Sequence, residues 1–204
     1  PGAKAVVQLY LPGNYGGDAL ADILAGDVNP SGRLPYTYPK FEQGIITYDH
    51  KPSQNLEKKM EGAYDYGAET SVQYPFGFGL SYTTFEYSGL TVDKKDFAPG
   101  DKIAVTVQVK NTGNVAGKET VMLFSSDLVA SLSPDVRRLR AFEKISLKPG
   151  ETQTVTFGLK GEDLAFVNEQ GRWVLEEGEF MLQVGTQTVG IHCTATKIWE
   201  TPNK

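Results

Sequence analysis

The sequence predicts a mostly β protein in which a β-sandwich follows a short βα unit and a long linker. Residues 103–109 alternate strictly between larger apolar side chains and small or polar ones, which is the pattern of a strand with one buried face. Further apolar runs follow at short intervals, separated by turn residues. Residues 1–40 instead combine one apolar run with one stretch of helical spacing, which is typical of an α/β layer. The chain therefore changes class near residues 74–85.

The composition is that of an ordinary folded protein. Of 204 residues, 40% are hydrophobic and 22% are charged. A net charge of -5 with 20 Lys and Arg argues against a nucleic-acid binder, because phosphate binding needs a concentrated basic surface. Apolar runs such as residues 5–11 are far shorter than the ~20 residues of a membrane span. The single cysteine, Cys193, allows neither an intrachain disulfide nor a thiolate metal site. We expect no nucleic-acid partner, membrane span, metal or cofactor.

The amino-terminal part is predicted to be one βα unit. Residues 5–11 are nearly all apolar, which suits a strand covered on both faces in a parallel sheet. Residues 13–17 form a turn, and residues 18–25 place apolar side chains at helical spacing, with Gly26 as the C-cap. A unit of about 40 residues buries too little apolar surface to fold alone, so its partner elements are expected elsewhere.

The next segment is predicted to be a turn, an extended edge and a linker. Residues 29–32 have turn composition, and the prolines of residues 34–39 restrict that stretch to a sheet edge. Residues 40–73 show weak periodicity, which is typical of a functional loop or of a linker wrapped over another domain. Tyrosines at 48, 64 and 66 favour wrapping over disorder.

Residues 74–85, YPFGFGLSYTTF, are predicted to form a packing seam that enters a sheet. Gly77 and Gly79 alternate with Phe76 and Phe78, so aromatic rings stand beside backbone that can bend or be approached closely. The later apolar, Ser and Thr residues favour a strand over a helix. The seam holds no general base and no activated nucleophile, so we expect a mechanical role.

After the seam, the pattern predicts about seven strands in roughly 115 residues, the count of an immunoglobulin-like β-sandwich. The expected strands are 103–109, 120–124, 138–147, 154–159, 173–175, 180–184 and 189–198, with a helical turn at 163–166. No Cys-Trp-Cys pattern accompanies them, so a fibronectin type III-like variant fits better.

Three linked motifs resemble the carboxy-terminal region of family 3 glycoside hydrolases, the β-glucosidase and β-xylosidase group. The loop and helix at 12–24, together with GDVNPSGRLP at 26–35 (the exit segment), resemble the last helix and exit of that family's α/β sandwich domain. The seam resembles the family's most recognisable carboxy-terminal motif. The motifs at 111–113, 117–119, 139–144 and 148–152 resemble its fibronectin type III-like domain. Met122 departs from the glutamine frequent in the family, which affects packing rather than the assignment.

The resemblance implies three parts: residues 1–40 are the end of the α/β sandwich domain, residues 41–84 are the linker and seam, and residues 85–204 are the fibronectin type III-like β-sandwich. It also implies a parent enzyme that hydrolyses terminal β-linked glucose or xylose residues with two carboxylates about 5 to 5.5 Å apart. In enzymes of that family, both carboxylates belong to domains upstream of the region that this chain resembles. The resemblance therefore gives no residue of this chain a catalytic role. The opening at Pro1–Gly2, without a charged start or signal-like core, is typical of an excised fragment.

The expected role of the chain is therefore to brace the domains of its parent enzyme, and the chain alone is expected to be inactive. Its expected partners are the upstream barrel and α/β sandwich domains of the same enzyme, and the parent's oligo- or polysaccharide substrate. The resemblance also implies a periplasmic or secreted location. The alternative is a carbohydrate-binding module that holds polysaccharide through exposed aromatic side chains.

Four residues are candidates for a substrate subsite: Asn14, Tyr15, Asp49 and His50. The first two lie in the loop at 13–17, which could cradle an anion at the helix N-terminus or simply make a tight turn, since it lacks P-loop and Rossmann spacing. The Asp49–His50 pair could polarise a sugar hydroxyl, or it could be a solvated loop pair. We favour the solvated pair, because no third member of a catalytic set is visible.

Other polar and aromatic residues have two interpretations each. Arg137, Arg138 and Arg140 could bind an acidic surface or a uronate, or could blunt a solvated strand edge, which we favour. The linker tyrosines and Trp173 could stack on sugars, or pack between domains, which we also favour. His192 is expected on a strand surface rather than as a ligand.

Overall fold

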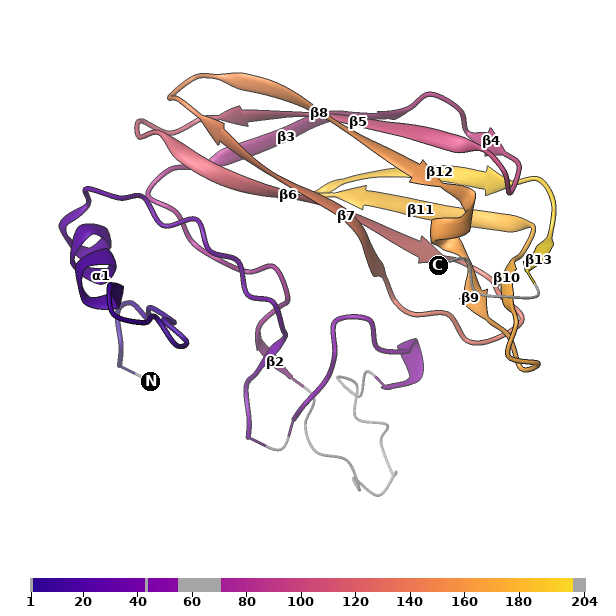
Figure 1. The fold of residues 1–204 in the computed structure, drawn as a ribbon, viewed down its shortest axis with the longest axis horizontal. Coiled ribbons are helices and arrows are strands. Elements are labelled where there is room, and N and C mark those ends of the chain that lie inside the picture. Colours follow the sequence, from indigo (N-terminus) through magenta and orange to yellow (C-terminus); the bar gives the residue numbers. More distant parts are fainter. Residues whose placement is uncertain (1, 43, 55–70, 200–204) are drawn as a thin grey trace.

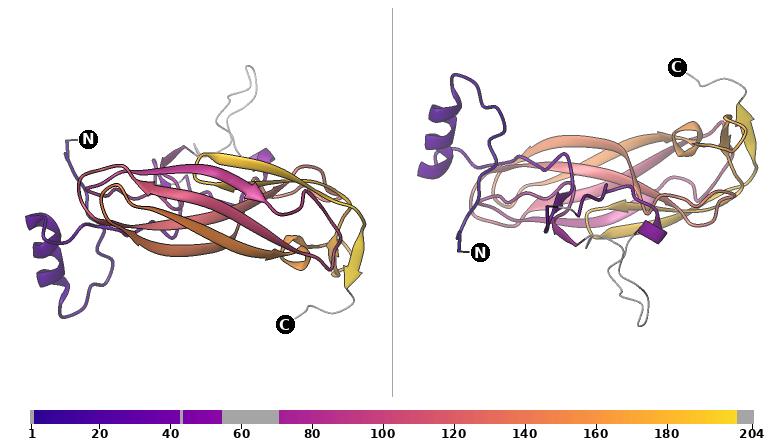
Figure 2. Two further views of the ribbon diagram at one scale, coloured as in Figure 1. Left: turned by 90° about the horizontal axis from the view of Figure 1, so that it is seen from above. Right: turned by 90° about the horizontal axis from the view of Figure 1, so that it is seen from below.

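The computed structural model describes residues 2–42, 44–54 and 71–199, and its main body is an elongated β-sandwich (Figure 1). Helix α1 (Gly16–Ala25) lies beyond one end of the sandwich, and a small sheet closes the other end (Figures 1 and 2). Among the described residues, no helix is long and apolar enough to span a membrane. The fold is mostly β, as the sequence predicts.

Two sheets form the sandwich, and every pairing in them is antiparallel except the parallel pair β12–β4. The first sheet has the order β3–β5–β8: β3 (Phe85–Val92), β5 (Lys102–Asn111) and β8 (Thr152–Lys160). The second has the order β4–β12–β11–β6–β7: β4 (Asp96–Phe97), β12 (Gln187–Cys193), β11 (Gly178–Val184), β6 (Gly117–Asp127) and β7 (Arg138–Leu147).

The core of the sandwich lies between these sheets. The four larger apolar residues of β5 are 0% exposed, as are Leu123 of β6 and Leu182 of β11. All of them belong to one cluster of buried side chains. Full burial of such a side chain contributes about 1.5–3 kcal/mol, so this cluster is the main stabilising feature of the fold. The predicted alternation at 103–109 is thereby confirmed.

The small sheet closes the end of the sandwich that lies away from α1. Its order is β13–β10–β9: β13 (Lys197–Trp199), β10 (Trp173–Leu175) and β9 (Phe166–Val167). The 3-10 turn η2 (Gly161–Leu164) leads into it. One strand was expected at 189–198, and this is wrong: the chain leaves β12 after Cys193 and starts β13 at Lys197. The polar, small residues between them carry no apolar alternation that could continue the strand.

Helix α1 is confirmed, but the strand expected before it is not. The helix begins at Gly16 and ends at Ala25, and the φ of 88° at its C-cap, Gly26, is the left-handed conformation that glycine favours. Residues 5–11 are not in a strand, and their side chains are exposed, Leu11 at 98% and Val6 at 71%. A buried parallel strand needs neighbours to bond its backbone and cover both faces, and the described residues supply none here.

The linker contains little regular structure. Strand β1 (Tyr38–Pro39) pairs with β2 (Val72–Tyr74), so the expected extended edge at 34–39 is confirmed only at its last two residues. The 3-10 turn η1 (Pro52–Gln54) lies between them in the sequence. The predictions for Tyr64 and Tyr66 fall outside the described residues.

The seam joins two strands rather than forming one. It begins on the last residue of β2 and ends on the first of β3, so the prediction that it enters a sheet holds only at its ends. Gly77 has a φ of +81°, a left-handed conformation that interrupts any extended run.

Candidate functional site

The seam and the exit segment meet at Arg33. Its guanidinium donates to the Gly79 carbonyl of the seam and pairs with the Glu119 carboxylate of β6. The two side chains are 16% and 8% exposed, so the pair is largely removed from water. Breaking such a pair leaves an uncompensated buried charge, which makes each partner depend on the other.

Tyr87 completes this network from the opposite sheet. Its hydroxyl donates to Glu119 Oε1 at 2.7 Å, so both oxygens of the carboxylate are bonded. Burial, and then the Glu119 carboxylate, raise the pKa of Tyr87, which therefore stays a donor. The network joins the exit segment, the seam, β6 and β3, and its Arg33–Glu119 pair links residues 86 positions apart in the sequence.

Asn29 makes a second junction. Its Oδ1 accepts from the Ser81 hydroxyl at 2.9 Å and from the Tyr82 backbone N–H at 2.8 Å, and its Nδ2 donates to the Ala116 carbonyl at 2.9 Å. The Tyr82 hydroxyl in turn donates to the Ile23 carbonyl of α1 at 2.7 Å. One asparagine thus ties the exit segment to the seam and to the turn before β6.

The glycines of the seam allow close backbone approach. The Leu34 N–H donates to the Phe78 carbonyl and the Gly77 N–H donates to the Leu34 carbonyl, both at 2.8 Å. A Cβ on Gly79 would overlap the Gly32 carbonyl oxygen, and one on Gly77 would lie 2.9 Å from Met122 Cε. The two glycines therefore leave room for the Gly32 backbone and for the Met122 side chain, and the predicted close approach to the seam backbone is confirmed.

A buried asparagine anchors the carboxyl end of the seam. Asn111 is 0% exposed, and its Oδ1 accepts from the Thr83 hydroxyl at 2.6 Å and from the Gly113 N–H at 3.0 Å. Its Nδ2 donates to the carbonyls of Val115 and Leu147 at 2.9 and 3.1 Å. Both donors and both acceptor positions of the amide are used, so this polar group is fully satisfied in the interior.

Aromatic rings fill the space beside these polar contacts. Tyr48 of the linker stacks on Phe76 of the seam with centroids 4.3 Å apart, and Phe76 meets Phe124 of β6 edge-on at 6.2 Å. Tyr74 and Phe78 stack at 4.9 Å. Tyr48 of the linker thus packs against the seam and β6 within this chain, and packing between domains stays a prediction.

The four subsite candidates do not come together. Asn14 and Tyr15 precede α1, and Tyr15 is 81% exposed. Asp49 and His50 precede η1, which lies well away from α1 in all three views (Figures 1 and 2). His50 Nδ1 lies 2.7 Å from the Thr47 carbonyl oxygen. The candidates therefore cannot form one subsite within this chain.

The arginine cluster differs from its prediction. Strand β7 is an edge strand, as expected, but the three arginines are not merely solvated. Arg137 lies over the Phe124 ring at 4.6 Å, Arg138 pairs with Asp135 at 3.0 Å, and Arg140 Nε donates to Ser125 Oγ at 2.6 Å. Burial, and then the like charge of Arg138, lower the pKa of Arg140 to about 10. Contacts with Phe124, Asp135 and Ser125 therefore hold arginine side chains that the sequence pattern predicts to be solvated.

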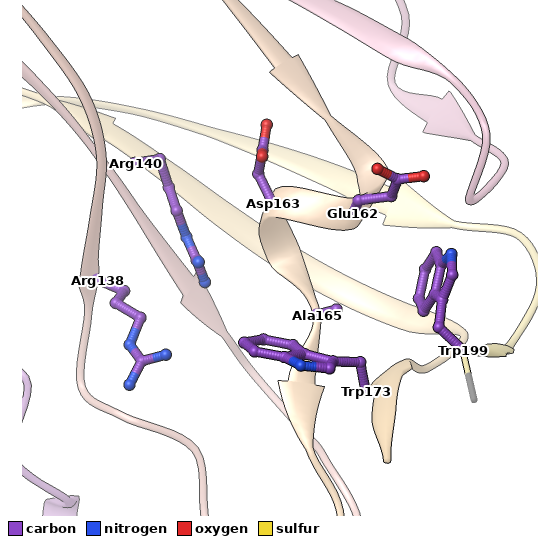
Figure 3. A pocket seen from close by; sticks show the side chains of 7 residues that line it. All are labelled: Arg138, Arg140, Glu162, Asp163, Ala165, Trp173 and Trp199. Atoms are coloured by element: carbon purple, nitrogen blue, oxygen red, sulfur yellow. The ribbon is translucent and has the colours of Figure 1, made fainter. Parts of the chain in front are cut away.

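A pocket of about 280 Å³ lies beside these arginines (Figure 3). We call it the tryptophan pocket, and its lining residues are Arg138, Arg140, Glu162, Asp163, Ala165, Trp173 and Trp199. Trp173 lies on β10, at the end of the sandwich away from α1 (Figure 1), and its packing between domains stays a prediction. Trp199 lies one residue beyond the strand predicted at 189–198, so the sequence pattern does not indicate it.

His192 and the expected absence of a metal site remain to be compared with the structure. His192 lies on β12 opposite Glu179, with its side chain 35% exposed, which agrees with the expected strand position. The part of the chain that the structure describes contains no group of three or more His, Cys, Asp or Glu residues able to hold a metal ion.

Residues 1–82 match the glycosyl hydrolase family 3 C-terminal domain, and residues 119–188 match the fibronectin type III-like domain. The chain has the carboxy-terminal domains of the family 3 glycosyl hydrolases. The resemblance drawn from the exit segment, the seam and the sandwich motifs is confirmed by both matches.

Curated family 3 relatives share both domains with this chain. It is 39% identical over 199 residues to the lysosomal beta glucosidase of Dictyostelium discoideum, which covers 92% of this chain and 23% of that protein. It is 43% identical over 190 residues to thermostable beta-glucosidase B of Acetivibrio thermocellus, covering 89% and 25%. The chain spans about a quarter of the length of these relatives.

A solved family 3 structure has the same fold. The beta-glucosidase from Listeria innocua in complex with glucose superposes with a TM-score of 0.82 at 33% identity, covering 92% of this chain and 28% of that one. The agreement therefore extends over most of the chain and a little more than a quarter of that enzyme.

Proposed function

We propose that this chain is the bracing part of a β-glucosidase-like family 3 glycoside hydrolase and that the catalytic carboxylates lie outside it. The proposed division is residues 1–40 for the end of the α/β sandwich domain, 41–84 for the linker and seam, and 85–204 for the β-sandwich. The names of the relatives, beta-glucosidase and beta-xylosidase, support hydrolysis of terminal β-linked glucose or xylose residues by the whole protein. The two-carboxylate retaining mechanism is the one we expect there.

The observation that carries the bracing function is the Arg33 network. One arginine of the exit segment holds the seam carbonyl at Gly79 and the β6 carboxylate at Glu119, which Tyr87 also binds from the other sheet. A charge-assisted, largely buried set in which both carboxylate oxygens are bonded fixes direction as well as distance. It therefore sets the orientation of the amino-terminal part relative to the sandwich.

The exposed apolar side chains of the amino-terminal part support the proposed partner. Val6, Leu11 and Leu24 are 71%, 98% and 67% exposed and lie at the end of the molecule that carries α1. Neighbouring apolar side chains left open to water are typical of a surface that another element covers. We assign this surface to the remainder of the α/β sandwich domain of the same enzyme.

Bracing affects catalysis through position. A displacement of about 1 Å in a catalytic group can cost ~100-fold in rate, so a rigid seam can support activity without touching substrate. In the full-length enzyme, Arg33→Ala should lower kcat/KM for an aryl β-glucoside by roughly ten-fold or more at a temperature where the protein remains folded.

The matched control is Arg172→Ala, which removes an exposed arginine of the sandwich. We expect the control to leave both kcat/KM and the melting temperature unchanged. Equal activity of the two variants would contradict the bracing function. The isolated chain should not hydrolyse the same substrate, and turnover by a pure sample would show that a catalytic pair had been overlooked.

A further inference from the structure

The tryptophan pocket contains the chemical groups of a saccharide site. Trp173 and Trp199 are direct partners on β10 and β13, so their side chains project from the same face of the small sheet. Figure 3 shows the two rings on one side of the hollow, with the arginines of β7 and the carboxylates of η2 around the rest. Concave sites with aromatic walls and a few convergent polar groups are the usual form of small-molecule sites.

The two tryptophans are not equivalent. Lys197 Nζ lies 4.9 Å from the centroid of the Trp199 ring, so one face of that ring already has a cation above it. Trp173 has no ring or cation partner among the described residues. Trp173 packs partly against the hydrophobic core, and its pocket-lining surface is the one left to stack against the C–H face of a sugar.

Arg140 supplies unused donors. Its Nε is taken by Ser125 Oγ, a hydroxyl that is itself nearly buried, and this bond fixes the side chain against β6. Within residues 71–199, no carboxylate lies within ion-pair distance of its guanidinium. The remaining N–H groups are thus held at the pocket wall, where a ligand oxygen can accept from them.

The net charge of the pocket lining favours a neutral ligand. The pocket is lined by two arginines and by two carboxylates, Glu162 and Asp163, so its lining carries no net charge. An anion would meet the carboxylates, and a cation would meet the arginines. A hydroxyl both donates and accepts, so a neutral polyhydroxylated ring can use both kinds of group at once.

A neighbouring cavity extends the tryptophan pocket. A second cavity of about 280 Å³ shares Arg138, Arg140, Ala165 and Trp173 with the first, and continues toward Asp127 and the loop at 130–135. Both lie at the end of the sandwich opposite α1, away from the apolar surface that we assign to the α/β domain (Figures 1 and 2). More than one sugar unit can therefore line up along the shared wall.

We propose that the tryptophan pocket binds a neutral β-linked saccharide, with Trp173 stacked on one pyranose ring, Arg140 donating to hydroxyl oxygens and the η2 carboxylates accepting from hydroxyl hydrogens. This site is separate from the Arg33 network and does not depend on the bracing function. It would hold substrate chains near the enzyme without taking part in their hydrolysis.

Intrinsic fluorescence tests the proposal directly, because the sequence has only 2 tryptophans and both line the pocket. The chain is titrated with methyl β-D-glucopyranoside, methyl β-D-xylopyranoside and cellobiose, with sorbitol and D-glucuronate for comparison. We expect a saturable change in emission with the glycosides and tighter binding of cellobiose than of the single-ring glycosides. Sorbitol should give none, and glucuronate should bind more weakly than the glucoside. No saturable change with any glycoside, or tighter binding of glucuronate, would overturn the proposal.

Two variants locate the site. Trp173→Ala keeps Trp199 as the reporter and should abolish saturable binding. Glu162→Ala removes an exposed carboxylate, and should weaken cellobiose binding about ten-fold, or about 1.4 kcal/mol, with an unchanged melting temperature. Arg172→Ala, outside the pocket, should bind as the unmodified chain does. If Trp173→Ala does not fold, Glu162→Ala decides alone: binding equal to that of the Arg172→Ala control would refute the assignment.

Discussion

Two partly buried arginines at opposite ends of the sandwich differ in how far their hydrogen bonds are satisfied. Arg33 pairs with a carboxylate and a carbonyl, and the carboxylate is bonded again by Tyr87. Arg140 has one hydroxyl partner and faces a hollow. Arg33 is thus held between a seam carbonyl and a carboxylate whose two oxygens are both bonded, which suits a bracing role at the seam end. Arg140 lacks a carboxylate partner among the described residues and lines a concave surface, which suits ligand binding at the other end.

The largest expected effect follows from removing the counter-charge of Arg33. Glu119→Ala leaves a buried guanidinium without its carboxylate and Tyr87 without its acceptor, which should lower the free energy of unfolding by about 3–5 kcal/mol. Urea denaturation of the chain measures it. The control is Glu86→Ala, an exposed glutamate of β3, which should change stability by less than about 0.5 kcal/mol. Equal losses of stability in Glu119→Ala and Glu86→Ala would show that the Arg33 network does not hold the seam end together.

The close approach of the seam and exit segment gives the next effect. Gly79→Ala places a methyl group against the Gly32 carbonyl oxygen, so the backbone has to shift at a cost of about 1–3 kcal/mol. Gly190→Ala is the matched control, because a Cβ there meets nothing within 4 Å. Thermal unfolding should separate the variants by several degrees. A melting temperature as high for Gly79→Ala as for Gly190→Ala would show that the seam is loosely packed.

A smaller effect is expected at the buried amide of Asn111. Thr83→Val removes the hydroxyl donor to Asn111 Oδ1 but keeps the side-chain shape, and the Gly113 N–H still bonds that oxygen. We expect a loss of about 1 kcal/mol in denaturant unfolding. Thr106→Val, at an exposed threonine pair, should be neutral and serves as the control. A neutral Thr83→Val would show that this bond adds nothing to the seam.

The smallest effect concerns pH at the pocket end. Burial, and to a lesser extent Glu176, raise the pKa of Asp127 to about 6, against an ordinary value near 3.8. Between these values the folded chain binds more protons than the unfolded chain, so this group makes the protein less stable as pH rises toward 6. Asp127→Asn should therefore be more stable than the unmodified chain at pH 7, with the difference disappearing below about pH 4. Urea midpoints at several pH values measure it, and a difference that does not change with pH would be inconsistent with the shift.

Two apolar runs show how much of the fold follows from the sequence. Residues 103–109 form the predicted strand because β3 and β8, which bond it on both sides, belong to the same chain. Residues 5–11 are at least as apolar but form no strand, because no described residue bonds them in a sheet. Local pattern identifies what an element can become, and its neighbours decide whether it forms. The two-residue strands β4 and β9 are too short to leave any pattern.

The candidate site shows the same limit. The motifs that contain Arg33 and Glu119 were both recognised in the sequence, but nothing local states that side chains 86 positions apart are paired. The tryptophan pocket was missed for a related reason, since Trp173 and Trp199 become neighbours only through the β10–β13 pairing. The sequence has only 2 tryptophans, and this scarcity was the signal that could have drawn attention to them.

The central claim is that Arg33 and Glu119 act as one unit that joins the exit segment to the sandwich. A double-mutant cycle on the chain tests it, with Arg33→Ala, Glu119→Ala and the double variant measured by urea denaturation. We expect the double variant to lose at least about 1 kcal/mol less than the sum of the two single losses, because the second substitution removes a group already left unpaired. Additive losses would show instead that the two side chains stabilise the protein independently.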